Sequence, residues 1–277
     1  MVKRKLKFKK KKNQRMNFVV FAASFLICCC IAISIIVPAT LKKDAFYEIE
    51  DKQKAMKKSQ KEDPEGVQTI GWIKVQGTKI DAPIITYEEP ANLNYLEKDN
   101  FVWTDAKDDK YRNQVKILGH NILNLSPTPE IGLQYFTKFE DLMAYTYEDF
   151  VKENKYIQYT LGQKNYIYKI FAVLYEEDYI LDIYNTEEYT SEKMSKYVEL
   201  VKEKSLYNFE VEVNNDDNII VLYTCTRMYG AKQPKQFAVV GRLLREDEKI
   251  ENYEFTTTEQ YKEILEIMKG VDGNEEL

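Results

Sequence analysis

Histidine is almost absent from this chain, and cysteine is scarce. The 277 residues include one histidine, His120, and four cysteines, three of which are the consecutive residues 28–30. Because a closed structural zinc site needs four Cys or His ligands, His120 and the remaining cysteine, Cys225, cannot form one. Glycine (10) and proline (7) are also few and 31% of the residues are charged, which excludes collagen-like, low-complexity and wholly disordered chains.

Acidic residues are missing from the N-terminal part. Residues 1–43 contain 11 of the 40 basic residues and no Asp or Glu, so residues 44–277 hold the other 29 basic and all 45 acidic residues. The difference between 29 and 45 gives this larger part a net charge of −16. Nucleic-acid binding depends largely on Lys and Arg that neutralise phosphates, so we expect no nucleic-acid partner.

Charged residues are also missing between positions 16 and 41. The apolar stretch 18–39 is 22 residues long, and a helix needs about 20 residues to cross the hydrocarbon core of a bilayer. A cleaved signal peptide is the alternative, but its apolar stretch is shorter and the Pro-Ala-Thr sequence at 38–40 is a poor cleavage site. We therefore expect an uncleaved, single-pass anchor in the cell membrane. The basic residues 1–15 place the N-terminus in the cytoplasm and the rest of the chain outside.

Outside this predicted anchor, Cys225 is the one cysteine and His120 the one histidine. A lone cysteine in a secreted domain cannot form an internal disulfide, and it is either a buried inert residue or a reactive thiol. A thiolate nucleophile and an imidazole that transfers protons are the minimum set for thiol catalysis. We take Cys225 and His120 as candidate catalytic residues.

Short β-like segments with turn signals dominate the region after residue 66. Alternating apolar and polar residues on both sides of Gly162 predict a β-hairpin. The segment 138–150 is compatible with a helix or a strand. The β-like segments are 71–75, 80–85, 114–118, 155–161, 165–175, 218–226 and 237–244.

Two helices are predicted in the second half of the chain. Residues 191–204 place apolar side chains at helical spacing, and Ser191 can cap this helix. Residues 256–259 form a capping box that opens a short C-terminal helix. The apolar positions of the first helix are Met194, Tyr197, Val198 and Val201.

Five segments, taken in order, resemble the sortases. Residues 71–84 (GWIKVQGTKIDAPI) resemble the opening of sortase domains, and 117–121 (ILGHN) resemble the strand end that carries the sortase histidine. Residues 221–225 (VLYTC) resemble the sortase signature TLxTC, with Val in place of the first Thr. The segment 237–244 (FAVVGRLL) resembles the strand that closes the sortase barrel. The helix 191–204, just before the Cys strand, resembles the insertion that marks class B sortases.

This resemblance implies a mainly β fold with peripheral helices. The expected architecture is an eight-stranded sortase β-barrel with a class B-type helix before the Cys strand and an N-terminal membrane helix. The expected segments are a cytoplasmic basic segment (1–15), a transmembrane anchor (16–41), a helical stem (42–66), the sortase catalytic domain (67–250) and a C-terminal helical tail (251–277).

The implied activity is cysteine transpeptidation on a Gram-positive surface, with no cofactor and no metal. Cys225 would form an acyl-thioester with the C-terminal sorting signal of a secreted protein, and His120 would protonate the leaving amine. An amine of peptidoglycan or of a pilin would then accept the acyl group. The loop 175–190, which precedes the Cys strand, would select the sorting signal. Some sortases bind calcium, but we interpret Asp105, Asp108 and Asp109 as a solvated loop.

One family feature is missing. Sortases carry an arginine immediately before the last strand, and here Gln236 stands at that position. Gln236 and Arg227 are both candidates for the donor to the oxyanion or substrate. Arg242 lies six residues further, about 20 Å along a strand, which is too far. The alternatives are a sortase-like module that binds sorting signals without efficient turnover, and a cell-wall cysteine peptidase.

Overall fold

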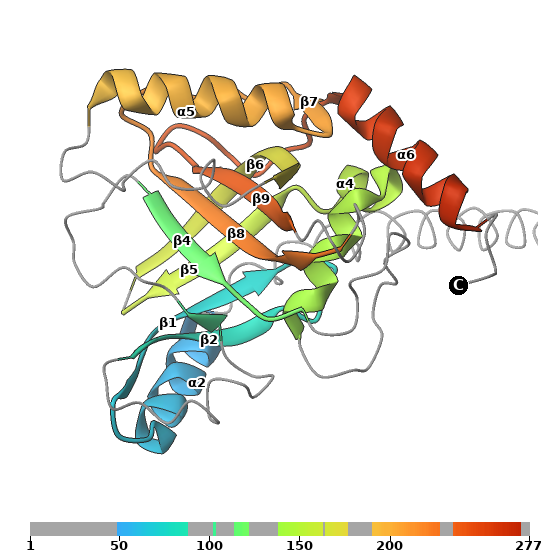
Figure 1. The fold of residues 1–277 in the computed structure, drawn as a ribbon. Coiled ribbons are helices and arrows are strands. Elements are labelled where there is room, and N and C mark those ends of the chain that lie inside the picture. Colours follow the sequence, from blue (N-terminus) through green and yellow to red (C-terminus); the bar gives the residue numbers. More distant parts are fainter. Residues whose placement is uncertain are drawn as a thin grey trace, which may run out of the picture. The chain divides into compact units, whose positions relative to one another are not determined.

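Eight strands close into a β-barrel in the part of the chain that the structure describes (Figure 1). This structure is a computed structural model, and it describes residues 49–87, 102–103, 114–121, 138–162, 164–176, 190–227 and 235–272. The strands are β1 (Val67–Val75), β2 (Asp81–Tyr87), β3 (Val102–Trp103), β4 (Gln114–Leu118), β5 (Tyr156–Leu161), β6 (Lys164–Glu176), β8 (Ile219–Thr226) and β9 (Lys235–Leu243). The eight-stranded barrel expected from the resemblance is confirmed.

The order of the strands around the barrel is β1-β2-β3-β4-β8-β9-β6-β5. The β2–β3 and β4–β8 pairs are parallel, and the other neighbouring pairs are antiparallel. β4 and β8 come from distant parts of the sequence, so their pairing unites the segment before His120 with the segment that contains Cys225. The topology thus brings both candidate residues to one end of the barrel.

Several sequence-based predictions concern residues outside those described. These are the basic segment 1–15, the anchor 16–41 with its three cysteines, the loop 105–109 and residues 177–189 of the predicted selectivity loop. Among the described residues, none of the helices combines the length and the hydrophobicity that crossing a bilayer requires.

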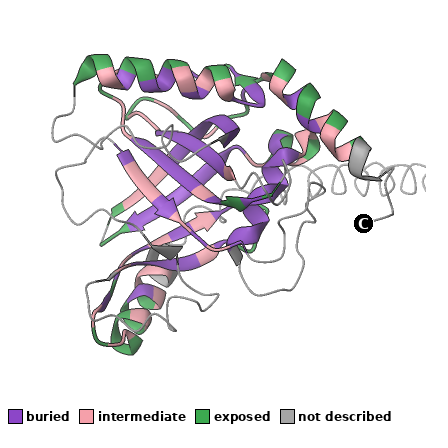
Figure 2. Ribbon diagram, viewed as in Figure 1, coloured by how far each residue is buried: buried purple, intermediate pink, exposed green. Residues whose placement is uncertain are grey.

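Local sequence patterns account for most of the strands. β1 alternates between buried and more exposed residues, as a strand with one face on the core does. β5 and β6 form the predicted hairpin, and Gly162 has a φ of 57° in its turn, which costs least for a residue without a Cβ. β8 and β9 are buried almost throughout, because the 3-10 helix η2 (Lys138–Thr146) packs against both. Figure 2 shows the buried residues concentrated in the barrel strands.

The helix α5 (Ser191–Lys204) lies against β6 and corresponds to the predicted helix. It buries Met194, Tyr197, Val198 and Val201, as the helical spacing predicts. The predicted cap is wrong by one residue: the Thr190 side chain accepts the Lys193 N–H, and Ser191 is the first helical residue. Thr190 takes this place because its backbone is extended, as a cap requires.

The predicted stem contributes the helix α2 (Ile49–Glu62), which packs on β1. Met56 is buried at this contact. The Lys52 ammonium donates to both carboxylate oxygens of Asp81, at 2.7 and 2.6 Å, and the Trp72 indole N–H donates to the same carboxylate. Burial opposes ionisation of Asp81, but the hydrogen bonds from Lys52 and Trp72 outweigh it and lower its pKa. An ion pair and an apolar contact therefore fix α2 to the barrel.

Two further segments complete the fold. The ambiguous segment 138–150 forms η2 and the start of the short helix α4 (Glu148–Glu153). Near the C-terminus, β10 (Phe255–Thr257) pairs with β7 (Tyr207–Phe209), and the predicted helix α6 (Glu259–Asp272) follows. The predicted capping box at 256–259 is wrong, because Thr256 lies in β10 and Thr258 caps the helix by accepting the Tyr261 N–H at 3.4 Å.

Candidate functional site

The parallel pairing of β4 and β8 brings the segments that carry His120 and Cys225 to the same end of the barrel. The arrowheads of the two strands point the same way in Figure 1. Their register ends with Leu118 paired to Tyr223. Continued by two residues beyond the end of β4, the same register would place His120 opposite Cys225. Opposite residues of neighbouring strands project from the same face of a sheet. The two candidate residues therefore come from the same end of the barrel, His120 two residues after β4 and Cys225 near the end of β8.

The burial pattern of β8 turns the Cys225 thiol outward. Thr224 and Thr226 are buried, whereas Cys225 between them is exposed. His120 is half-buried beside it. A thiol on the outer face can be reached by a substrate, and a half-buried imidazole can be held in one orientation.

Gln236 faces Cys225 from the other neighbouring strand. The antiparallel register of β8 and β9 pairs Cys225 directly with Gln236. Side chains at such positions have their Cβ atoms about 4.5–5.5 Å apart on one face. The Gln236 Oε1 atom is buried and makes no hydrogen bond among the described residues. Cys225 and Gln236 thus lie side by side on β8 and β9, and His120 follows the end of β4, the other neighbour of β8.

Two basic residues lie near Cys225 and Gln236 along the chain. Arg227 follows Cys225 by two positions and is exposed, and Lys235 pairs with Thr226. Positive charge near a cysteine favours its thiolate form. In the described part of the chain, no group of three or more His, Cys, Asp or Glu residues is arranged to hold a metal ion.

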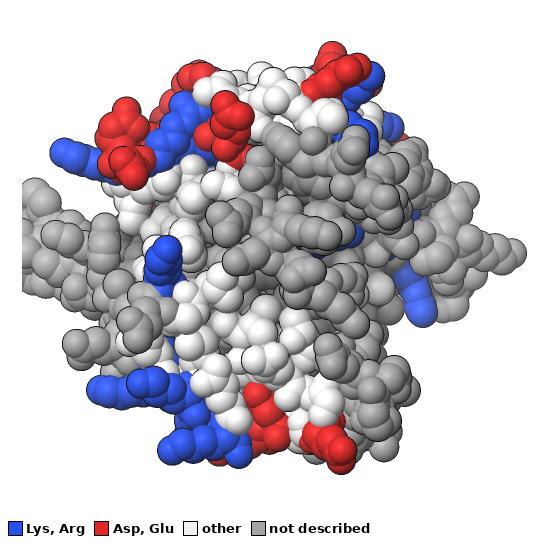
Figure 3. All heavy atoms as spheres, turned by 90° about the vertical axis from the view of Figure 1, so that its left-hand side faces the viewer, with Lys and Arg blue, Asp and Glu red and all other residues white. Residues whose placement is uncertain are grey.

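Acidic and basic side chains are interspersed on the face of the molecule shown in Figure 3. Among the described residues of this face, the basic side chains at the lower edge lie beside acidic ones, unlike a purely basic surface that follows a phosphate backbone.

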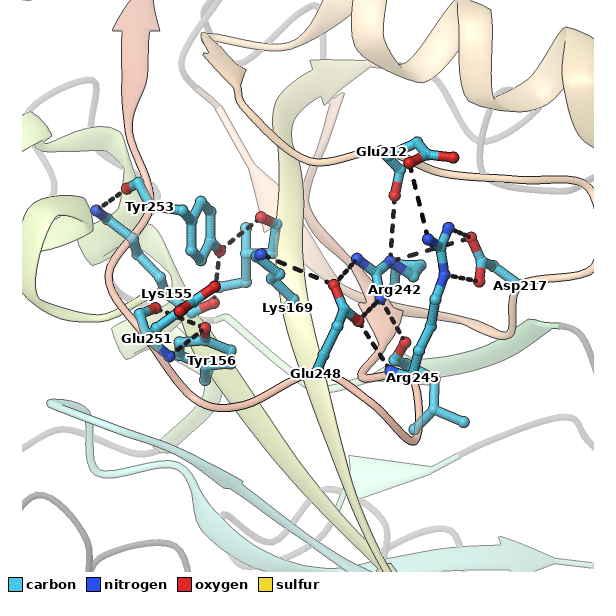
Figure 4. Close-up of polar contacts among 12 residues, drawn as sticks. Lys155, Tyr156, Lys169, Glu212, Asp217, Arg242, Arg245, Glu248, Glu251 and Tyr253 are labelled. Atoms are coloured by element: carbon cyan, nitrogen blue, oxygen red, sulfur yellow. Dashed lines mark hydrogen bonds and ion pairs between the residues drawn. The ribbon is translucent and has the colours of Figure 1, made fainter.

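Arg242 lies at the opposite end of β9. The register pairs it with Ile219, at the start of β8, whereas Gln236 pairs with Cys225 near its end. Figure 4 shows the buried Arg242 guanidinium held by Glu248, with a further bond to the Glu212 carbonyl oxygen. Arg242 therefore belongs to a structural network, and the argument from strand length that it is too far from the site is confirmed.

Sequence reasoning missed two side chains that join the strand ends. The Thr224 hydroxyl donates to the Gly119 carbonyl oxygen at 2.6 Å, and the Asn121 amide donates to the Cys225 carbonyl oxygen at 3.0 Å. Each lies next to a candidate catalytic residue in the sequence, and that adjacency is the signal by which they could have been found.

Comparison with known proteins finds sequence similarity to sortases B. No protein-family model matches the chain. The chain is 30% identical over 159 residues to sortase B of Listeria monocytogenes, which covers 56% of this chain and 62% of that relative. It is 26% identical over 183 residues to sortase B of Staphylococcus aureus, which covers 64% of this chain and 70% of the relative. The matched region thus spans less than two thirds of the Listeria protein.

The fold is also shared with solved structures. The structure of sortase B from Clostridium perfringens matches with a TM-score of 0.53 and 24% identity, over 68% of this chain and all of that one. A structure of sortase B complexed with triglycine matches with a TM-score of 0.52 and 19% identity, over 76% of this chain and all of that one. The sequence similarity and the common barrel agree with the resemblance found in the motifs: this chain is similar in sequence to sortases B and shares their fold.

Proposed function

We propose that this protein is a cysteine transpeptidase that joins secreted proteins to an amine on the cell surface. The observation that carries the proposal is the parallel β4–β8 register, which, continued two residues beyond the Leu118–Tyr223 pair, would place His120 opposite Cys225. They are the two residue types that thiol acyl transfer requires, and the thiol is exposed to a substrate. The similarity to two sortases B supports the same activity.

The first half of the reaction is acylation of Cys225. The thiolate sulfur attacks the carbonyl carbon of a peptide bond in the C-terminal sorting signal, and a tetrahedral oxyanion forms. The C–N bond then breaks, and the protonated His120 imidazole gives its proton to the leaving amine. The product is an acyl-thioester on Cys225 and a released C-terminal peptide.

The second half transfers the acyl group to an amine. The incoming amine attacks the thioester carbonyl, His120 takes a proton from the attacking nitrogen, and the Cys225 thiolate leaves. The acceptor is an amine of a peptidoglycan precursor or of a pilin. The similarity to a sortase B complexed with triglycine supports an amine of the glycyl type.

Gln236 is our first candidate for the donor that stabilises the oxyanion. Its position opposite Cys225 supports this role, because an amide N–H at about 2.7–3.1 Å from the oxyanion can stabilise it. Arg227 is the second candidate, because it is exposed two residues beyond Cys225. Neither role requires a metal or a cofactor.

The proposed location is the outer face of the cell membrane. The uncharged stretch 18–39 and the basic residues before it support a single-pass anchor with a cytoplasmic N-terminus. The substrates of the proposed reaction are secreted proteins and cell-wall or pilin amines, which are found on this side of the membrane.

One observation favours a second candidate function. The side chain opposite Cys225 is a neutral amide, where sortases carry an arginine. A weaker oxyanion donor would slow the chemical step, and the protein would then bind sorting signals with little turnover.

A peptide assay separates the two functions. The purified protein is incubated with a library of sorting-signal peptides, with and without triglycine, and both the thioester on Cys225 and the products are followed by mass spectrometry. A transpeptidase accumulates the thioester and passes it to triglycine. A binding module retains the peptide intact. Hydrolysis that triglycine does not divert into a ligated product would instead indicate a cysteine peptidase.

A further inference from the structure

The β4–β8 ladder ends just before His120 and Cys225. Its last backbone bond runs from the Gly119 N–H to the Tyr223 carbonyl oxygen, at 3.3 Å. If the ladder continued by one step, the Asn121 N–H would donate to the Cys225 carbonyl oxygen, since a parallel ladder advances two residues at a time. The Asn121 side-chain amide donates to this carbonyl oxygen, at 3.0 Å. The Asn121 side chain thus takes the place of its own backbone N–H as the donor to the Cys225 carbonyl oxygen.

This bond holds the main chain of Cys225 against the segment that carries His120. Gly119, on the other side of His120, accepts the Thr224 hydroxyl at 2.6 Å. His120 and Cys225 therefore lie between two cross-strand hydrogen bonds, one from each strand. The separation of the imidazole and the thiol depends on the length of both bonds.

Asn121 acts from the inner side of the sheet. Gly119 and Asn121 are buried while His120 between them is half-buried, and Cys225 is exposed. The Asn121 side chain therefore does not share the face on which the thiol reacts. Its effect on the reaction passes through the Cys225 backbone.

We propose that Asn121 is a positioning residue that sets the distance between the His120 imidazole and the Cys225 thiol. This role rests on the proposed transpeptidase function for its effect on turnover. The coupling between imidazole and thiol can be measured without any substrate, so the two proposals can fail separately.

The test uses the full chain with Cys28, Cys29 and Cys30 replaced by Ala, so that Cys225 is the only thiol. The variants are Asn121→Ala, which removes the amide, and Asn121→Leu, which keeps a similar size, adds no charge and removes the donor. The matched control is Asn154→Ala. Asn154 donates its side-chain amide to the Phe150 carbonyl oxygen, also at 3.0 Å, at a different place in the fold.

The first measurement is the pH dependence of Cys225 alkylation by iodoacetamide. We expect both Asn121 variants to shift this profile in the same direction as His120→Ala, and Asn154→Ala to leave it unchanged. The second measurement is steady-state transpeptidation. A displacement near 1 Å should lower kcat by roughly 10- to 100-fold with KM within about twofold.

Four outcomes overturn the positioning role. Two concern Cys225 alkylation: the pH profiles of the Asn121 variants coincide with that of the parent, or His120→Ala leaves the parent profile unchanged. Two concern transpeptidation: Asn154→Ala loses as much kcat as the Asn121 variants, or the Asn121 variants show only a higher KM. If Asn121→Ala does not fold, Asn121→Leu decides in the same way. If the parent shows no transpeptidation with any peptide, the proposed function fails and the alkylation profiles still decide the role of Asn121.

Discussion

Phe139 packs so closely on Gly119 that a Cβ atom at position 119 would lie 2.2 Å from the Cγ atom of the phenyl ring. Phe139 stands near the start of η2 and is 2% exposed, so its ring has no open space to move into. Gly119 is the residue directly before His120. The missing side chain at position 119 is therefore what allows η2 to lie against the strand end that carries the histidine.

We predict that Gly119→Ala both destabilises the protein and impairs catalysis. Overpacking of this kind costs about 1–3 kcal/mol of unfolding free energy. The same strain displaces His120, so kcat/KM should fall at least roughly tenfold. Chemical denaturation and the peptide assay measure the two effects.

Gly162→Ala is the matched control. Gly162 has a φ of 57° but no atom within 4 Å of a built Cβ, so this variant should lose about 1 kcal/mol and keep its activity. Equal stability and activity of the two variants would show that the contact with Phe139 is not a constraint.

Replacement of Cys225 by Ala should abolish transpeptidation. The loss should exceed the ~10²–10⁴ that acid–base help supplies, because no thioester can form. The thiol is exposed, so the unfolding free energy should stay within about 0.5 kcal/mol of the parent. His120→Ala should lose about 10²–10⁴ in rate and still form some thioester. Product formation by Cys225→Ala near the parent level would rule out the mechanism.

The Ala variants of Gln236 and Arg227 should separate the two candidate donors. Loss of one oxyanion donor costs about 10²–10³ in rate, so the true donor should lose at least tenfold in kcat/KM and the other little. Because Gln236 lies opposite Cys225, we expect the larger loss there. Gln236→Arg should keep or raise activity, since a charged donor binds an oxyanion more strongly. If all three variants match the parent, the donor lies elsewhere, such as a backbone N–H.

Truncation should distinguish the anchor from the helix α2. Removal of residues 1–43 leaves α2 and its bonds to the barrel intact, so the fragment should fold and keep its chemistry in solution. Removal of residues 1–66 also deletes Met56 and the Lys52–Asp81 ion pair. The burial of Met56 alone is worth about 1.5–3 kcal/mol, which urea denaturation would detect. An insoluble 44–277 fragment, or equal stability of the two fragments, would contradict this prediction.

Acid should weaken the fold through Glu248. The hydrogen bond from the Arg242 guanidinium lowers the pKa of Glu248 from 4.5 to about 2. A carboxyl group with a lowered pKa stabilises the folded state above its unfolded pKa, and this stabilisation is lost as the pH falls. The Tm of the parent should therefore decline more steeply between about pH 4.5 and 2 than the Tm of Glu248→Gln.

Glu266→Gln provides the control for this titration. Glu266 pairs with Lys269 on α6 and is 73% exposed. Its replacement should therefore leave the dependence of Tm on pH the same as in the parent. Parallel curves for the parent and Glu248→Gln would show that the ion pair with Arg242 does not contribute to the pH dependence.

The parts of the fold that could be predicted are those encoded by local patterns. The β5–β6 hairpin follows from alternation around Gly162, and the buried face of α5 follows from helical spacing. His120 and Cys225 are candidates by counting, because the chain contains so few residues of these types.

Other features depend on tertiary context. Thr190 and Ser191 can both cap a helix, and the choice between them depends on where the backbone turns. The bond from Asn121 to the Cys225 carbonyl oxygen depends on the register of two distant strands, which no local pattern fixes. The contact of Phe139 with Gly119 likewise requires η2 to be in place.

For the proposed transpeptidase, the parallel β4–β8 pair would also determine when activity appears during folding. It joins groups such as Gly119 and Thr224, which are 105 positions apart in sequence. Contacts of such long range form late, because closing the intervening chain has an entropic cost that only the completed barrel offsets. A partly folded chain therefore carries an ordinary, unactivated cysteine. The rate at which activity returns during refolding would therefore report the rate at which the barrel closes. A newly made chain would not react with its substrates before the barrel has closed.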